Sequence, residues 1–170
     1  MVKHAFLILS VLLTGCFLLG PDAGLVSTRI GHEVRDKNEQ HIDMTEMTDF
    51  PWDELYLFGP YQARDSICRT LQIGGTECSR VSPEMVDEGD VLLVFRNRGD
   101  IAHVEKHRRY LGDFSSADKS DPIRREDAKF IVEQSSVAAD GKPWLKLNLL
   151  QRSNPPKRTS PNGEGPIDRH

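Results

Sequence analysis

His103 and His107 come closest to the residue types and spacing of a metal site. On a strand they would share one face but lie about 13 Å apart, at roughly 3.3 Å per residue, which is too far for one ion. On a helix the spacing would suit two ligands, but a zinc protease motif needs a glutamate directly after the first histidine, and that position holds Val104. Because no third ligand can be named, we predict no metal site.

Other catalytic patterns are absent from the sequence. There is no Gly-x-Ser-x-Gly that would expose a serine at a strand-to-helix turn. Adjacent carboxylates such as Asp53-Glu54 are typical of a solvated edge, and Gly74-Gly75 lacks the Lys-Ser/Thr that a phosphate-binding loop needs. We therefore predict a protein that is not an enzyme and binds no cofactor.

Two groups of residues are candidates for binding a partner. Basic residues gather around one predicted hairpin: Arg96, Arg98, Lys106, His107, Arg108 and Arg109. A hairpin that brings Arg96 near Lys106 would offer a basic patch to anionic lipid, a cell-wall polymer or an acidic protein; the alternative is an ordinary charged surface. Trp52 beside Pro51 is either a contact anchor for a partner or part of the core.

The N-terminus has the layout of an export signal. Met1-Val2-Lys3 is a short basic start, and an apolar stretch with few interruptions follows from Ala5 to Leu19. Within that stretch, Leu13-Thr14-Gly15-Cys16 resembles the lipobox of bacterial lipoproteins. The resemblance implies cleavage before Cys16, loss of residues 1–15 and lipidation of the Cys16 thiol, and two or more acyl chains hold a protein stably on a membrane.

This resemblance indicates a location and no activity. It implies a cell-envelope protein, lipid-anchored and facing the periplasm, with the outer membrane favoured. Two alternatives remain open: a secreted protein cleaved near Ala23-Gly24, and an uncleaved anchor, for which an apolar run of about 15 residues falls short of the roughly 20 that span a bilayer.

The remaining cysteines indicate a disulfide. With Cys16 lipidated, Cys68 and Cys78 form a pair, and an even number of thiols in an oxidising compartment predicts a bridge. The spacing is not Cys-x-x-Cys, so a redox or metal role is disfavoured. The net charge of −4 and the lack of a strongly basic half predict no binding to nucleic acid.

The elements that would position these residues form one domain. Residues 16–48 are predicted to be the lipid attachment site followed by a flexible tether, because residues 20–48 are polar with little apolar periodicity. Residues 151–170 are proline-rich and predict a disordered tail. Between them, residues 49–150 predict an α+β domain with one helix packed on a small antiparallel sheet, in the order β-α-β-β-β-β. Its elements are a buried strand over 53–58, a helix from Tyr61 to Gly74, a hairpin over 91–107 and a second hairpin over 130–149.

We therefore expect a membrane-tethered, non-enzymatic binding, inhibitor or immunity-type module whose partner is an envelope protein or a cell-wall component. The alternatives are an envelope enzyme acting on wall or lipid substrates, and a structural subunit of an envelope assembly.

Overall fold

The protein has an α+β fold with two antiparallel sheets. The computed structural model describes residues 24–114 and 121–150. The helical elements are α1 (Leu25–Gly31), the π-helix η1 (His32–Asp36), α2 (Met44–Met47), α3 (Arg64–Leu71), α4 (Gly75–Cys78) and the 3-10 helices η2 (Arg109–Leu111) and η3 (Arg125–Asp127). The strands are β1 (His41–Asp43), β2 (Glu54–Phe58), β3 (Asp90–Asn97), β4 (Asp100–Arg108), β5 (Ile123–Arg124), β6 (Lys129–Val137) and β7 (Pro143–Leu149).

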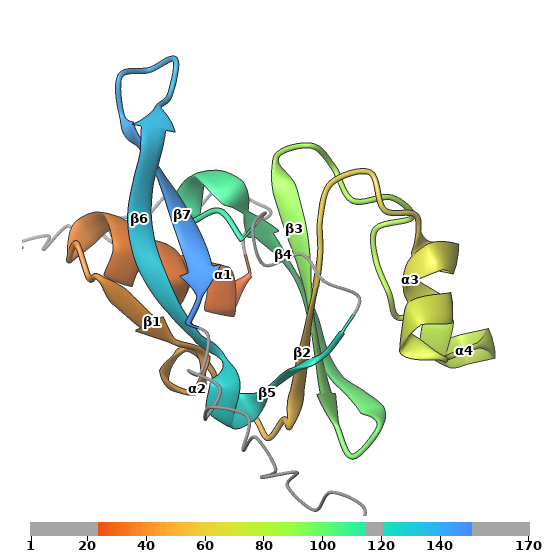
Figure 1. Ribbon diagram of the computed structural model, residues 1–170. Helices are drawn as coiled ribbons and strands as arrows, with labels where there is room; N and C mark the ends of the chain where they lie inside the picture. The colour runs from red at the N-terminus through yellow and green to blue at the C-terminus, as the bar shows by residue number, and fades with distance from the viewer. Residues whose placement is uncertain (1–23, 115–120, 151–170) are drawn as a thin grey trace, which may run out of the picture.

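The sheets form separate layers. One has the strand order β1-β6-β7 and the other the order β4-β3-β2-β5. They lie side by side in Figure 1, and α3 and α4 cover the far face of the second sheet. The expectation of a single sheet with one helix was therefore too simple, although both predicted hairpins, β3–β4 and β6–β7, are present.

Alternate residues of β2 and β3 supply two separate hydrophobic clusters. Leu55 and Leu57 face the larger cluster between the sheets, where Phe95, Phe114 and Phe130 are fully buried. The next residues along the same strands face the smaller cluster under α3: Tyr56, Phe58, Leu92 and Val94. A strand that is apolar on both faces is expected where both faces are covered, so the prediction for 53–58 is confirmed.

The predicted disulfide is also confirmed. Cys68 near the end of α3 bonds Cys78 at the end of α4 and joins these two short helices. The helix itself is shorter than the predicted span from Tyr61 to Gly74: it begins at Arg64 after the extended Ala63, and it ends at Leu71 because Gln72 adopts the left-handed conformation.

The predicted tether is wrong for residues 24–48, which are part of the folded domain. Val26, Ile30 and Val34 are spaced four apart and are buried along α1 and η1, and Ile42 of β1 joins them in the same cluster. One apolar residue per turn leaves the segment polar on average, yet it suffices to bury one helical stripe. The domain therefore begins before residue 49. Cys16 and the predicted tail at 151–170 lie outside the described residues.

Candidate functional site

The strand register separates the predicted basic patch into two ends. In the β3–β4 hairpin, Arg96 pairs with Ile101, whereas Lys106 pairs with Leu92. Four residues along a strand correspond to about 13 Å. Arg96 and Arg98 thus lie at the turn, while Lys106, Arg108 and Arg109 lie at the opposite end, and the expectation that Arg96 approaches Lys106 is wrong.

At the turn, local contacts hold the two arginines. The Arg96 guanidinium donates to the Gly99 carbonyl and lies 6.0 Å from the centre of the Tyr56 ring. The Arg98 backbone N–H donates to the Asp53 carboxylate at 2.8 Å, and the Arg98 residue is exposed.

At the opposite end, two arginines neutralise buried carboxylates. Arg108 donates to Asp90 at 3.1 Å, and Arg109 donates to both carboxylate oxygens of Asp113 at 3.0 Å. Asp90 and Asp113 are almost fully buried, and the hydrogen bonds that Arg109 donates to Asp113 raise the pKa of Arg109. These two guanidiniums therefore act within the fold, because burying either carboxylate without a cation would be costly.

Trp52 is a core residue, so its assignment as a contact anchor is wrong. It is 3% exposed, its indole N–H donates to Thr48 Oγ1 at 2.8 Å, and its ring meets Phe95 edge-on at 5.3 Å. The guanidinium of Arg125 covers the ring at 5.2 Å.

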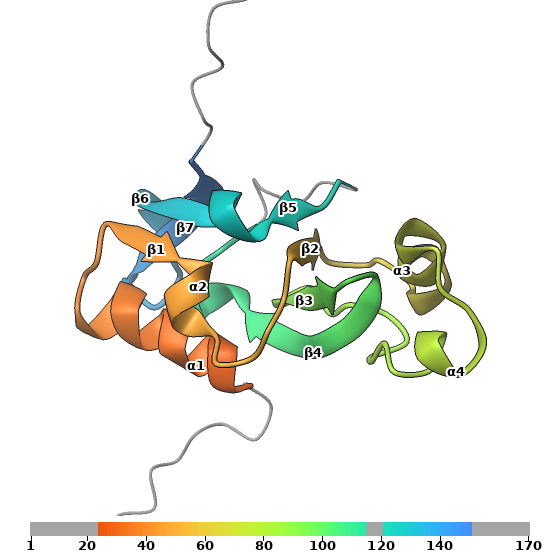
Figure 2. The same ribbon diagram turned by 90° about the horizontal axis from the view of Figure 1, so that it is seen from below.

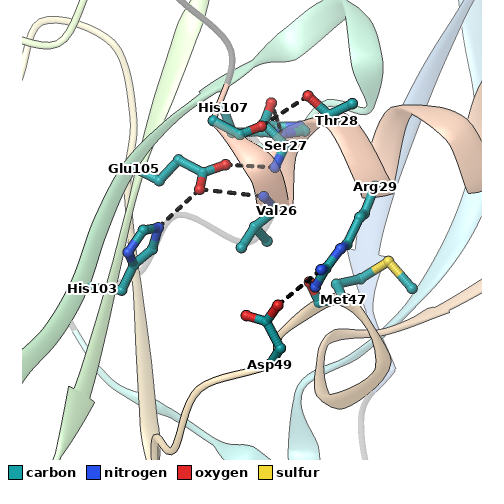
Figure 3. A network of polar contacts seen from close by, with 10 residues as sticks. Val26, Ser27, Thr28, Arg29, Met47, Asp49, His103, Glu105 and His107 are labelled. Atoms are coloured by element: carbon teal, nitrogen blue, oxygen red, sulfur yellow. Dashed lines mark hydrogen bonds and ion pairs between the residues drawn. The ribbon is translucent and has the colours of Figure 1, made fainter.

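The side chains best suited to catalysis or ligand binding meet where α1 packs on β4 (Figure 3). We call the group Ser27, His103, Glu105 and His107 the α1–β4 clasp. Glu105 accepts the backbone N–H of Ser27 at 2.6 Å and that of Val26 at 3.3 Å, and it bonds His103 at 2.9 Å. The first turn of a helix has N–H groups without intrahelical partners, and a carboxylate there is also favoured by the helix dipole. Glu105 therefore caps α1 from a strand far away in the sequence.

The clasp holds the Glu105 carboxylate in its charged form. Burial on its own raises the pKa of Glu105, but the hydrogen bond from His103 and the two backbone donors of α1 outweigh it and lower the pKa below its usual value.

Ser27 and His107 form a hydrogen-bonded pair that resembles a nucleophile and its base. The Ser27 hydroxyl lies 3.0 Å from His107 Nδ1, and His107 Nε2 lies 2.6 Å from the Gly112 carbonyl oxygen. Since a carbonyl only accepts, Nε2 carries the proton and donates it, and Nδ1 accepts from the serine. Burial lowers the pKa of His107 to about 4, so the ring is neutral near pH 7.

This pair has no route to a substrate in the described structure. Ser27 and His107 are both 0% exposed, and Ser27 Oγ also accepts the backbone N–H of Arg108 at 3.4 Å. Every polar atom of the two side chains has an internal partner. The clasp thus docks α1 on β4, and no group of three metal-ligating side chains gathers within residues 24–114 and 121–150.

A surface groove lies beside η1, η2 and the β6–β7 hairpin. It has a volume of about 540 Å³, and we call it the hairpin groove. Its walls combine apolar and polar side chains: Val34, Arg35, Asp36, Asn38, Tyr110, Leu111, Ala138, Asp140, Lys142, Pro143, Trp144 and Leu145. Tyr110 is 55% exposed, a large fraction for an aromatic side chain next to a cavity.

Fixed contacts hold the walls of the groove in place. Arg35 donates to the Tyr110 carbonyl at 2.7 Å and to the Pro143 carbonyl at 2.8 Å, which ties η1 to both other segments. The Trp144 indole N–H donates to Asp113 at 2.8 Å, and the guanidinium of Arg109 lies 5.6 Å from its ring. A preformed, partly apolar cavity with a few polar groups is the usual form of a binding site.

The groove is balanced in charge. Arg35 and Lys142 face it together with Asp36 and Asp140. Asp36 bonds His32 at 2.9 Å, and Lys142 lies 3.7 Å from its neighbour Asp140. Neither a polyanion nor a polycation would find a complementary surface here.

Sequence reasoning assembled neither site, although it singled out His103 and His107 of the clasp. Ser27 and the η1 wall of the groove belong to the segment that we expected to be a tether, while Trp144 was placed on a strand without a role. Three segments that are far apart in the chain form the groove, and local sequence patterns cannot predict that such segments meet. The sequence signal for the clasp is Glu105, a single acidic residue on the buried face of a strand. That signal can be used only once it is known which face of the strand is buried.

Comparison with known proteins adds no relative: no family model, no curated protein and no solved structure matches this chain. Among the described residues, no helix has both the length and the apolar character needed to cross a membrane.

Proposed function

We propose that this protein is an exported lipoprotein, acylated at Cys16, whose domain binds an extended segment of another envelope protein and catalyses no reaction. Leu13-Thr14-Gly15-Cys16 supports the anchor, which would hold the protein on a membrane facing the periplasm, with the outer membrane favoured. The Cys68–Cys78 disulfide is consistent with an oxidising compartment. An inhibitor or immunity role fits this description.

The hairpin groove is the observation that carries the binding function. Its rigid walls, exposed Tyr110 and apolar Trp144 and Pro143 suit the side chains of a peptide. Its balanced charges favour a partner that also carries both signs, as protein segments do, over a uniformly anionic wall polymer.

The α1–β4 clasp supports a function without catalysis. Ser27 and His107 are the pair best suited to nucleophilic chemistry, and both are fully buried with internal hydrogen bonds. A catalytic base has to come within hydrogen-bonding reach of its substrate.

Crosslinking in the native envelope tests the proposal. The full chain is captured with its crosslinked partners, in parallel with Tyr110→Ser and Lys142→Glu in the groove. Tyr61→Asn is the matched control, because Tyr61 is an equally exposed tyrosine outside the groove, at 64%, and asparagine tolerates its positive φ of 66°. Arg98→Glu tests the exposed arginine of the β3–β4 turn.

We expect one protein partner to be lost from the groove variants and kept by the Tyr61 control. A partner that is lost only from Arg98→Glu would move the binding surface to the β3–β4 turn. Capture of a wall polymer, unaffected by any groove variant, would overturn the assignment of a peptide ligand. Mass analysis of the mature chain tests acylation at Cys16 separately.

A further inference from the structure

The segment between the proposed lipid anchor and the folded domain is short. This inference rests on the proposed lipidation of Cys16. Because the described fold already includes Gly24, at most eight residue steps separate Cys16 from it. Even fully extended, eight steps span at most about 29 Å.

That length is smaller than the domain. A globular domain of roughly 120 residues has a radius of gyration of about 14 Å, which corresponds to a sphere about 35 Å across. The described chain begins at α1 and ends just after β7, and Figure 2 shows these two ends on opposite sides of the domain. A connection of eight residues cannot pass around the domain to let the Leu150 side meet the membrane.

We propose that the outer stripe of α1 and the start of η1, formed by Leu25, Arg29 and His32, faces the lipid headgroups and fixes the orientation of the domain on the bilayer. These residues recur at helical spacing on the side of the helix opposite the buried Val26 and Ile30. Leu25 is 59% exposed and lies next to the point where the chain enters.

The stripe is close to neutral in charge, so its contact with the membrane does not depend on charged lipid. Arg29 pairs with Asp49 at 2.9 Å, and His32 pairs with Asp36 at 2.9 Å. Attraction to anionic lipid is therefore weak, and the length of the connection sets the orientation. The contact does not require anionic lipid and is insensitive to salt.

Fluorescence quenching at two matched positions tests the orientation. Cys68 and Cys78 are bonded to each other, and the proposed acylation occupies Cys16, so one introduced cysteine is the single site for a thiol label. Leu25→Cys and Leu150→Cys replace exposed leucines, at 59% and 44%. Leu25 begins α1 and Leu150 directly follows β7, and these two ends of the described chain lie on opposite sides of the domain in Figure 2. The full chain is reconstituted in phosphatidylcholine vesicles that contain a lipid with a nitroxide on its headgroup.

We expect several-fold stronger quenching of the label at position 25 than at position 150, unchanged in high salt. Inserting a Gly/Ser spacer of about 20 residues between Ala23 and Gly24 should remove the difference, since such a linker is flexible and longer than the domain when extended. Equal quenching without the spacer, or stronger quenching at position 150, would overturn the orientation.

Flotation of the same vesicles separates this inference from the proposed function. A chain that floats with the lipid but shows equal quenching keeps its anchor and loses the fixed orientation. A chain that does not float with the vesicles has no anchor, and both proposals fall.

Discussion

The α1–β4 clasp and the hairpin groove differ in which side chains they bury and which they expose. The clasp contains a serine, a carboxylate and two histidines, the residue types of many active sites, and three of these four residues are buried. The groove is built largely from residues without reactive groups, such as Trp144 and Pro143, and it opens to solvent.

The difference teaches that accessibility, rather than residue type alone, decides which side chains a ligand could reach. Inside the fold, Ser27 and His107 satisfy each other and lose contact with solvent. At the groove, the Tyr110 backbone carbonyl accepts from Arg35, and the residue is 55% exposed. The comparison predicts large effects on stability from clasp variants and small ones from groove variants.

Replacing Glu105 should have the largest effect. In Glu105→Ala the N–H groups of Val26 and Ser27 lose their buried acceptor, so the free energy of unfolding should fall by about 3 kcal/mol. Urea unfolding measures it, with Glu133→Ala as the control, since Glu133 is an exposed strand carboxylate whose loss should cost less than about 0.5 kcal/mol. Equal losses in the two variants would contradict the capping role.

Acid should weaken the clasp through His107. The unfolded histidine takes up a proton below pH 6.5, whereas the folded one does so only near its pKa of about 4. The contribution of the neutral His107 to the free energy of unfolding is therefore fully present above pH 6.5. It should decrease by about 3 kcal/mol as the pH falls to 4, at about 1.4 kcal/mol per pH unit.

Further loss should follow below pH 4.5, where protonation of Glu105 ends the contribution of its lowered pKa. Unfolding measured from pH 7.5 to 4 tests the first window, with His107→Gln expected to flatten it and the exposed His41→Gln expected to leave it unchanged. A wild-type profile that is flat down to pH 4.5 would contradict a buried, neutral His107.

A methyl group at Gly24 should disturb the clasp by a smaller amount. A Cβ at this position would overlap the Glu105 side chain, whereas a Cβ at Gly74 would meet no atom within 4 Å. We expect Gly24→Ala to lower the melting temperature and to cost about 2 kcal/mol by overpacking, and Gly74→Ala to be close to neutral. Two indistinguishable melting curves would show that Glu105 moves aside without loss.

The smallest effect on stability should come from the groove. Tyr110→Ser removes an exposed ring, and its unfolding free energy should stay within about 0.5 kcal/mol of the wild type. Binding to the crosslinked partner should nevertheless be lost. A large loss of stability in this variant would assign Tyr110 to the core and remove the contrast between the two regions.

The sequence predicted those parts of the fold that depend on neighbouring residues. The β3–β4 and β6–β7 hairpins follow local alternation and turn residues, and the Cys68–Cys78 bridge follows from the number of cysteines. The helix α1 was missed because one buried residue per turn is too weak a signal amid polar neighbours. The division into two sheets was missed because pairing such as that between His41 and Ile131 leaves no local trace.

The same reason explains the candidate sites. A strand register had to be known before Arg96 and Lys106 were found to be far apart, and three distant segments had to be assembled before the groove existed. Individual side chains were recognised for their chemistry, but their burial was not, and burial reversed the roles of Trp52 and His107.

The pairing of β1 with β6 has a consequence for the order of folding. His41 of β1 pairs with Ile131 of β6, and Ser27 of α1 contacts His107 of β4 across a sequence separation of 80 residues. The N-terminal elements therefore depend on partners that are synthesised much later. Chains dominated by such distant contacts fold slowly. A nascent chain of this topology cannot complete the β1-β6-β7 sheet, or the core beside it, until β6 and β7 have been made.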